Sequence, residues 1–160
     1  MPLPKHVFNP PFNVVRTSHV VLGVTDLDRS LAFYQATLGL HLEDRTETEA
    51  YLRGVEERQH HSLVLKTSAT PVCERPGYKL ASEEDLDKAA AFLTAKGLRH
   101  AFVDVPYQGR TLQATDPFGT PLEFYFKMEQ RERLLQLYGH YKGVQPQRLD
   151  HFNIFSPELQ

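Results

Sequence analysis

An internal repeat constrains the fold of this chain more than any other feature of its sequence. The segment at residues 26–33 (DLDRSLAF) recurs at residues 85–92 (DLDKAAAF), an offset of 59 residues. In both copies a helix-like period is followed by short runs typical of strands, and a strand precedes it, so each copy is predicted to be βαβββ. We therefore expect an α+β fold of paired βαβββ modules, with curved mixed sheets and flanking helices.

Capping signals indicate where both helices begin. Thr25 is followed three residues later by Asp28, and Ser82 by Asp85, which is the spacing of a capping box. In the strand before the first helix, His19 lies on the opposite face from the apolar residues at 20, 22 and 24 because side chains alternate along a strand. We expect those apolar residues to pack on the helix and His19 to face a concave surface.

The 160 residues suffice for one compact domain or for two small halves that share a core. We predict the following organisation: an extended N-terminal arm at 1–15, a first βαβββ module at 16–70, a second at 71–128, a connecting helix and linker at 129–147, and the first strand of an incomplete third module at 148–160. Within the connector, leucines predict a helix from about Glu129 to Tyr138. The linker between the modules, Thr67–Pro76, contains Cys73, for which no neighbouring motif indicates a nucleophilic role.

The third module is predicted from a second match inside the chain. Residues 148–159 (RLDHFNIFSPEL) align with residues 16–27 (RTSHVVLGVTDL) and place histidine on histidine. Because an isolated strand cannot bury its own apolar face, we expect that the chain is part of a longer protein or that this tail packs on a partner. The alternative is a C-terminal strand that pairs with the existing sheet.

Composition excludes several classes of function. Lys and Arg total 18 against 20 Asp and Glu, so no basic excess is present to hold a nucleic acid. No apolar stretch approaches the roughly 18 residues needed to cross a bilayer, and the first residues lack a secretory signal. A single cysteine rules out an internal disulfide. We expect a cytoplasmic protein with neither nucleic-acid nor membrane partners.

Three kinds of motif carry a resemblance to a known family. The helix opening at 25–27 (TDL), the helix end at 38–40 (LGL) and the last turn at 116–123 (DPFGTPLE) resemble the vicinal-oxygen-chelate superfamily, which includes glyoxalase, bleomycin resistance proteins and extradiol dioxygenases. Segments 12–16 (FNVVR), 56–65 (EERQHHSLVL) and 148–153 (RLDHFN) are more specific. They resemble the extradiol dioxygenases that cleave homoprotocatechuate (3,4-dihydroxyphenylacetate), over the N-terminal domain and the first strand of the catalytic domain.

The resemblance implies a reaction and an incomplete site. Such enzymes hold Fe(II), or Mn(II) in some members, with two histidines and a glutamate; a catechol chelates the metal, O₂ binds beside it, and the ring opens next to the diol. His151 matches the first histidine ligand, and Asn153 would contact substrate or orient a ligand. The remaining ligands and the acid-base histidine would lie beyond Gln160, so no catalytic residue is expected within this chain, which should be inactive alone. A homo-oligomer is also implied. An ordinary exposed histidine is the alternative for His151.

A vestigial metal site in the two modules is the other possibility. In smaller glyoxalase-like proteins four strand positions converge on the concave sheet, and His19 and Glu123 fit two of them. The repeat places Tyr78 and Ser62 at the other two, and both are poor ligands for a divalent ion. We expect a hydrogen-bonded His19–Glu123 pair in preference to a bound metal. Competing functions are therefore a stand-alone small-molecule binding module and a small glyoxalase-like metalloenzyme.

Two adjacent histidines, His60 and His61, fall in a predicted strand. On a strand they would face opposite sides and could not both meet one ion. His60 shares the side of Ser62 and is the one that could reach the concave surface, although a space-filling histidine at a strand edge is the simpler interpretation.

Overall fold

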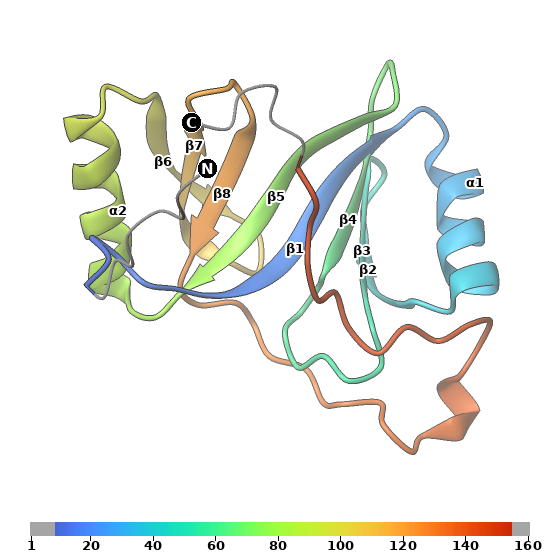
Figure 1. Cartoon of the computed structure of the whole chain (residues 1–160). Helices are drawn as coiled ribbons and strands as arrows, with labels where there is room; N and C mark the ends of the chain where they lie inside the picture. Colours follow the sequence, from blue (N-terminus) through green and yellow to red (C-terminus); the bar gives the residue numbers. More distant parts are fainter. Residues whose placement is uncertain (1–8, 155–160) are drawn as a thin grey trace, which may run out of the picture.

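The computed structural model describes residues 9–154, which form one curved sheet of eight strands in the order β2-β3-β4-β1-β5-β8-β7-β6 (Figure 1). The elements are β1 (Val14–Val24), α1 (Leu27–Ala32), η1 (Phe33–Leu38, π-helical), β2 (His41–Arg45), β3 (Glu49–Arg53), β4 (Leu63–Thr67), β5 (Val72–Leu80), α2 (Glu83–Ala95), β6 (His100–Val105), β7 (Gly109–Thr115), β8 (Pro121–Tyr125) and η2 (Tyr138–His140, a 3₁₀ turn). The expected α+β fold is confirmed. None of the helices among residues 9–154 is long and apolar enough to span a bilayer.

The sheet joins two halves of the same design at its centre. The first half runs β1-α1-β2-β3-β4 and the second β5-α2-β6-β7-β8. β1 pairs antiparallel with β5, while each of these strands pairs in parallel with the last strand of its own half. Parallel neighbours need a long crossover, which the helix and hairpin of each half provide. Figure 1 shows α1 and α2 at opposite ends of the sheet.

The two faces of the sheet differ in chemistry. We call the face that carries Val20 and Phe124 the outer face; Val20 packs with the cluster that contains Leu27 of α1, and Phe124 with the cluster that contains Leu86 of α2. We call the opposite face, which carries His19 and Glu123, the inner face. The predicted alternation of side chains in β1 is thus confirmed, because burial of two helices on one face fixes which residues point away from them.

The predicted N-cap residue is confirmed for α2 but not for α1. Ser82 caps α2 as predicted, since its hydroxyl oxygen accepts a hydrogen bond from the Asp85 amide at 3.1 Å. In α1 the cap is Asp26 and not Thr25, because Asp26 is the extended residue whose carboxylate accepts from the Arg29 amide at 2.9 Å. The prediction was wrong by one residue there.

The predicted helix from about Glu129 to Tyr138 is absent, and that prediction was wrong. Backbone groups of this stretch bond instead to the loop before β4: the His60 amide donates to the Glu129 carbonyl at 2.8 Å, and the Leu134 amide donates to the Val55 carbonyl at 2.8 Å. Leu134 is buried in this contact. Tertiary pairing has therefore overridden a weak helical preference, leaving only the turn η2.

The C-terminal tail is the third departure from the prediction. Residues 148–154 form neither a strand nor a helix, although they were predicted to begin a third module; residues 155–160 of that module, and residues 1–8 of the predicted arm, lie outside the described residues. In addition, β5 begins at Val72, inside the predicted linker Thr67–Pro76. The proposed boundaries of the modules stay a prediction.

Candidate functional site

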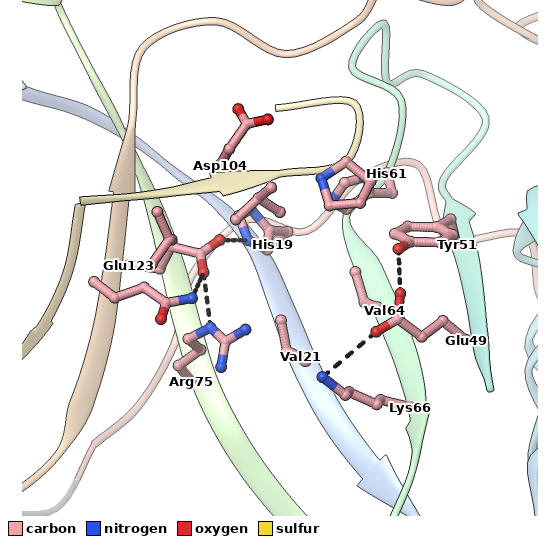
Figure 2. A pocket seen from close by; sticks show the side chains of 14 residues that line it. His19, Val21, Glu49, Tyr51, His61, Val64, Lys66, Arg75, Asp104 and Glu123 are labelled. Atoms are coloured by element: carbon pink, nitrogen blue, oxygen red, sulfur yellow. Dashed lines mark hydrogen bonds and ion pairs between the residues drawn. The ribbon is translucent and has the colours of Figure 1, made fainter. Parts of the chain in front are cut away.

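A pocket of about 210 Å³ opens on the inner face, where strands of both halves meet (Figure 2). We call it the inner pocket. Its lining combines ionisable side chains with apolar ones: His19, Val21, Glu49, Tyr51, His61, Val64, Lys66, Arg75, Val103, Asp104, Val105, Pro106, Gln113 and Glu123. Two residues singled out from the sequence, His19 and Glu123, are therefore brought together here, although they are 104 positions apart.

A close approach to the backbone of β5 positions His19. Its side chain is fully buried, and the ring lies against Gly77, where a Cβ atom would come 2.2 Å from the His19 Cε1 atom. Gly77 pairs with both His19 and Glu123 in the sheet. It thus occupies the position that the repeat assigned to Tyr78, which instead packs on Phe124 at the outer face. The repeat missed by one residue because β1 and β5 pair with shifts in register.

Glu123 is the centre of the inner-face hydrogen bonds. One carboxylate oxygen accepts from His19 Nε2 at 2.9 Å and Gln108 Nε2 at 2.7 Å, and the other from Arg75 Nε at 2.7 Å and Gln113 Nε2 at 3.0 Å. Burial disfavours its ionised form, but the hydrogen bonds from His19, Gln108 and Gln113 outweigh this and hold the pKa of Glu123 well below its ordinary value. The residue is a fixed, fully partnered anion.

This arrangement does not fit a divalent metal. A carboxylate offers about four lone-pair positions, and all of them on Glu123 are taken. Of the other two candidate positions, Gly77 has no side chain, and the Ser62 hydroxyl donates to the buried carboxylate of Glu57. Across residues 9–154 no group of three or more His, Cys, Asp or Glu side chains is placed to hold an ion. His19 and Glu123 form the expected hydrogen-bonded pair.

The two adjacent histidines depart from the prediction. β4 begins only at Leu63, so His60 and His61 lie in an irregular segment, and their Nδ1 atoms approach to 3.2 Å instead of facing opposite sides. His61, not His60, lines the inner pocket. Burial, reinforced by the neighbouring histidines at 19 and 60, lowers the pKa of His61 well below its ordinary value, so its imidazole is neutral at pH 7.

Tyr107, which the sequence did not single out, connects the second half of the sheet to the first. It lies in the turn between β6 and β7, and its ring stacks on His60 of the first half with centroids 3.7 Å apart. Its hydroxyl donates a hydrogen bond to Asp44 in β2. Tyr107 has φ of 65°, an unusual backbone conformation for a residue other than glycine, which the turn and these contacts hold in place. No short-range motif could have indicated a partner 63 residues away.

His151 and Asn153 lie away from the inner pocket. The tail crosses the outer face, where Phe152 packs edge-on against Tyr78 with centroids 5.8 Å apart. Both site residues line a second, outer cavity of about 500 Å³. The His151 side chain is 84% exposed, and its Nδ1 lies 3.4 Å from a carboxylate oxygen of Asp150. The structure therefore separates His151 and Asn153 from His19 and Glu123.

Comparison with known proteins gives the family. A profile of the Glyoxalase/Bleomycin resistance protein/Dioxygenase superfamily matches residues 16–124, which is most of the described chain. The chain belongs to this superfamily. It is 28% identical to a metapyrocatechase of Geobacillus stearothermophilus over 162 aligned positions, which cover 95% of this chain and 50% of that protein. It is 25% identical to a manganese-dependent 2,3-dihydroxybiphenyl 1,2-dioxygenase of Geobacillus genomosp. 3, covering 89% of this chain and 49% of the relative.

Solved structures of the superfamily show the same fold at higher identity. The homoprotocatechuate 2,3-dioxygenase of Brevibacterium fuscum, in complex with 3,4-dihydroxyphenylacetate, is 37% identical and superposes with a TM-score of 0.86, over 93% of this chain and 47% of that one. The homoprotocatechuate 2,3-dioxygenase of Arthrobacter globiformis is 34% identical with a TM-score of 0.86, over 91% and 46% of the two chains. This superfamily chain spans about half the length of the curated relatives it matches, which are extradiol dioxygenases.

Proposed function

We propose that this chain is the N-terminal, non-catalytic domain of an extradiol dioxygenase that cleaves homoprotocatechuate or a similar catechol. The observation that carries the proposal is the 37% identity and TM-score of 0.86 to a homoprotocatechuate 2,3-dioxygenase, over nearly all of this chain and about half of that one. The inner face supports a structural role, because its carboxylate is satisfied by protein donors and offers no site to a metal.

The tail would be this chain's contribution to the catalytic centre. His151 is exposed, its only ion-pair partner among residues 9–154 is its neighbour Asp150, and it belongs to no metal-binding group there, so it is free to join ligands from elsewhere. One imidazole alone cannot form the site of two histidines and a carboxylate that such dioxygenases need. His151 would help to hold the Fe(II) or Mn(II) that we propose for the complete site, and that metal would supply the binding of the catechol and of O₂. Asn153, close to His151 on the tail, would orient substrate or a ligand.

Oligomer formation is part of the same proposal. Val14 and Val15 at the start of β1 are exposed apolar residues, as is Leu137 near η2. Scattered exposed apolar residues are common on monomers, so these positions support an assembly only together with the relationship to the dioxygenases. Sedimentation of the complete protein would measure the assembly directly.

Catechol turnover by the product of the complete coding region tests the function. O₂ uptake with 3,4-dihydroxyphenylacetate would be measured after loading with Fe(II) or Mn(II), for the unaltered protein, for His151→Ala and for His140→Ala, an exposed histidine, as the matched control. We expect His151→Ala to lower kcat and metal content at least about 100-fold and the control to change both less than twofold. Full activity of His151→Ala, or turnover by residues 1–160 alone, would contradict the proposal.

A further inference from the structure

We propose that the inner pocket binds an uncharged monocyclic phenol, without any metal. This goes beyond the proposed function, because the inner pocket lies on the opposite face of the sheet from His151 and shares no catalytic role with it. The inference depends on the size of the pocket, on one unpartnered imidazole nitrogen, and on how the charges around it are paired.

The size of the inner pocket suits a single aromatic ring. Its volume is about 210 Å³. An apolar cavity of roughly 150 Å³ in a protein interior is large enough to take up benzene. A phenol therefore fits with room for its hydroxyl, whereas a fused or biphenyl ring system would need the walls to move.

One side of the inner pocket is apolar and aromatic. Val21, Tyr51 and Val64 form a buried cluster on the inner face, with Tyr107 packed against it. The rings of His61 and Tyr51 stand edge-to-face, with centroids 5.1 Å apart. Aromatic rings favour such geometries with further rings, so this wall offers both contact area and oriented edges to an aromatic ligand.

The polar contact comes from His61. This residue is 1% exposed, lines the inner pocket, and lies between His19 and Tyr51 in Figure 2. Its Nδ1 contacts His60 at 3.2 Å, while its Nε2 forms no hydrogen bond with any of residues 9–154 and is not among the buried unpaired atoms, so the pocket can reach it. A ligand hydroxyl can form a hydrogen bond with this nitrogen inside the pocket, where the lower dielectric makes such a bond stronger than in water.

A hydroxyl group satisfies that nitrogen whichever tautomer His61 adopts. If Nδ1 carries the proton, Nε2 is an acceptor; if His60 donates to Nδ1, then Nε2 carries the proton and is a donor. A phenolic hydroxyl can donate or accept, whereas a carboxylate can only accept. The geometry thus favours a phenol over an aromatic acid.

The charges around the inner pocket also favour an uncharged phenol over an aromatic acid. The two cations are already committed, Lys66 to Glu49 at 3.5 Å and Arg75 to Glu123 at 2.7 Å. Asp104, also at the pocket, forms no ion pair with any described residue. The lining therefore holds three acids and two bases, and an anionic ligand would meet net repulsion.

Metal-free titration calorimetry of the 160-residue chain with phenol, toluene and benzoate tests the proposal. We expect saturable phenol binding with a Kd of roughly 0.1–10 mM, the range accessible to a ligand of this size. Toluene and benzoate should each bind at least about tenfold more weakly, the first because it lacks the hydroxyl and the second because of its charge. Absence of saturable phenol binding at about 50 mM, or preference for benzoate, would overturn the proposal.

Two variants locate the site and a third serves as control. His61→Phe keeps an aromatic ring but removes the nitrogen, so it should weaken phenol about tenfold and toluene less than twofold. Val64→Phe fills the inner pocket and should weaken both. Cys73→Ser, which alters the outer cavity, should change neither. If only Cys73→Ser weakens binding, or if His61→Phe affects phenol and toluene alike, the assignment is wrong.

A measurement on the unaltered chain covers the case in which a variant fails to fold. The imidazole proton resonances of His61, assigned by NMR, should shift with phenol concentration along the same isotherm as the calorimetric signal. Unmoved His61 resonances at saturation would overturn the proposal. Because no metal or turnover enters these measurements, their failure leaves the proposed dioxygenase function untouched, and loss of that function leaves this inference standing.

Discussion

His19 and His151 occupy equivalent positions in the internal repeat, yet their surroundings in the structure are opposite. His19 is fully buried, with Gly77 beneath its ring and Glu123 at 2.9 Å from Nε2. His151 is 84% exposed, on a tail without strand pairing. The same residue in the same local pattern is thus locked in one place and free in the other.

The difference teaches that the neighbouring strands, and not the repeated segment itself, decide what such a histidine does. For His19 those strands are β5 and β8, which supply the glycine and the carboxylate. Among the described residues no strand pairs with the tail at His151 to do the same. A histidine that is saturated by protein partners supports the fold, whereas one without partners retains its capacity to bind.

The largest effect should come from removing the space beneath His19. In Gly77→Ala the new methyl group would fall 2.2 Å from the His19 ring, in a strand that cannot shift without breaking its pairing. We expect a loss of about 3 kcal/mol or more in the free energy of unfolding, measured by urea denaturation. Gly139→Ala, where nothing lies within 4 Å of the new atom, is the control. Equal free energies of unfolding for the two variants would show that the His19 ring does not require a glycine at position 77.

A smaller loss should follow when the anion at the centre of the inner face is neutralised. Glu123→Gln removes the charge that faces Arg75 and replaces an acceptor by a donor, so one or more buried donors lose their partner. We expect about 2 kcal/mol of destabilisation. Glu74→Gln provides a matched control, since Glu74 contacts the same arginine at 3.2 Å but is more exposed, and it should cost less than about 0.5 kcal/mol.

Acid should weaken the buried region through His61. Its pKa in the folded protein is held well below the ordinary value of 6.5, mainly by burial and then by His19 and His60, although Glu123 acts in the other direction. Below pH 6.5 the unfolded chain binds a proton that the folded chain does not, so stability falls as pH falls and is regained above pH 6.5.

Between pH 7 and pH 5.5 we expect His61 to lower the free energy of unfolding by about 1 kcal/mol. The difference between the unaltered chain and His61→Phe isolates this contribution in denaturation curves at the two pH values. His140→Phe, the same substitution at an exposed histidine, serves as the matched control. An identical slope in all three proteins would show that His61 is not the responsible group.

The smallest effect belongs to the exposed histidine. His151→Ala should change the stability of the 160-residue chain by less than about 0.3 kcal/mol, because its imidazole makes no buried contact. Thermal unfolding of His151→Ala and of His19→Ala, measured side by side, would compare the stability contribution of the exposed histidine with that of the buried one. A large loss in His151→Ala would mean that the tail is structurally committed and would weaken its proposed role as a free ligand.

Local patterns sufficed for the order of the elements and for the faces of β1. Alternation placed His19 opposite Val20, and the Ser82 cap was predicted from four consecutive residues. These features depend on neighbours in sequence, which is why they could be predicted. The family followed from motifs at helix ends and turns.

The rest of the site depended on pairing between distant strands. Because β1 and β5 pair with shifts in register, Gly77 and not Tyr78 lies opposite His19. Backbone hydrogen bonds between the connector and the loop before β4 take the place of the helix predicted after Glu129. The donors to Glu123, Arg75 and Gln108 among them, come from separate strands and turns. No spacing in the sequence encodes such contacts, because they exist only once the two halves have joined.

The stacking of Tyr107 on His60 has a mechanical consequence for any molecule that enters the inner pocket. The β6–β7 turn is fastened to the first half by this ring and by the bond to Asp44, so opposite ends of the curved sheet cannot spread apart independently. We therefore expect the width of the pocket opening, which these contacts help to set, to influence how fast a ligand exchanges. Tyr107→Ala would remove these contacts between the two halves, and we expect the two ends of the sheet to move relative to each other more freely in this variant.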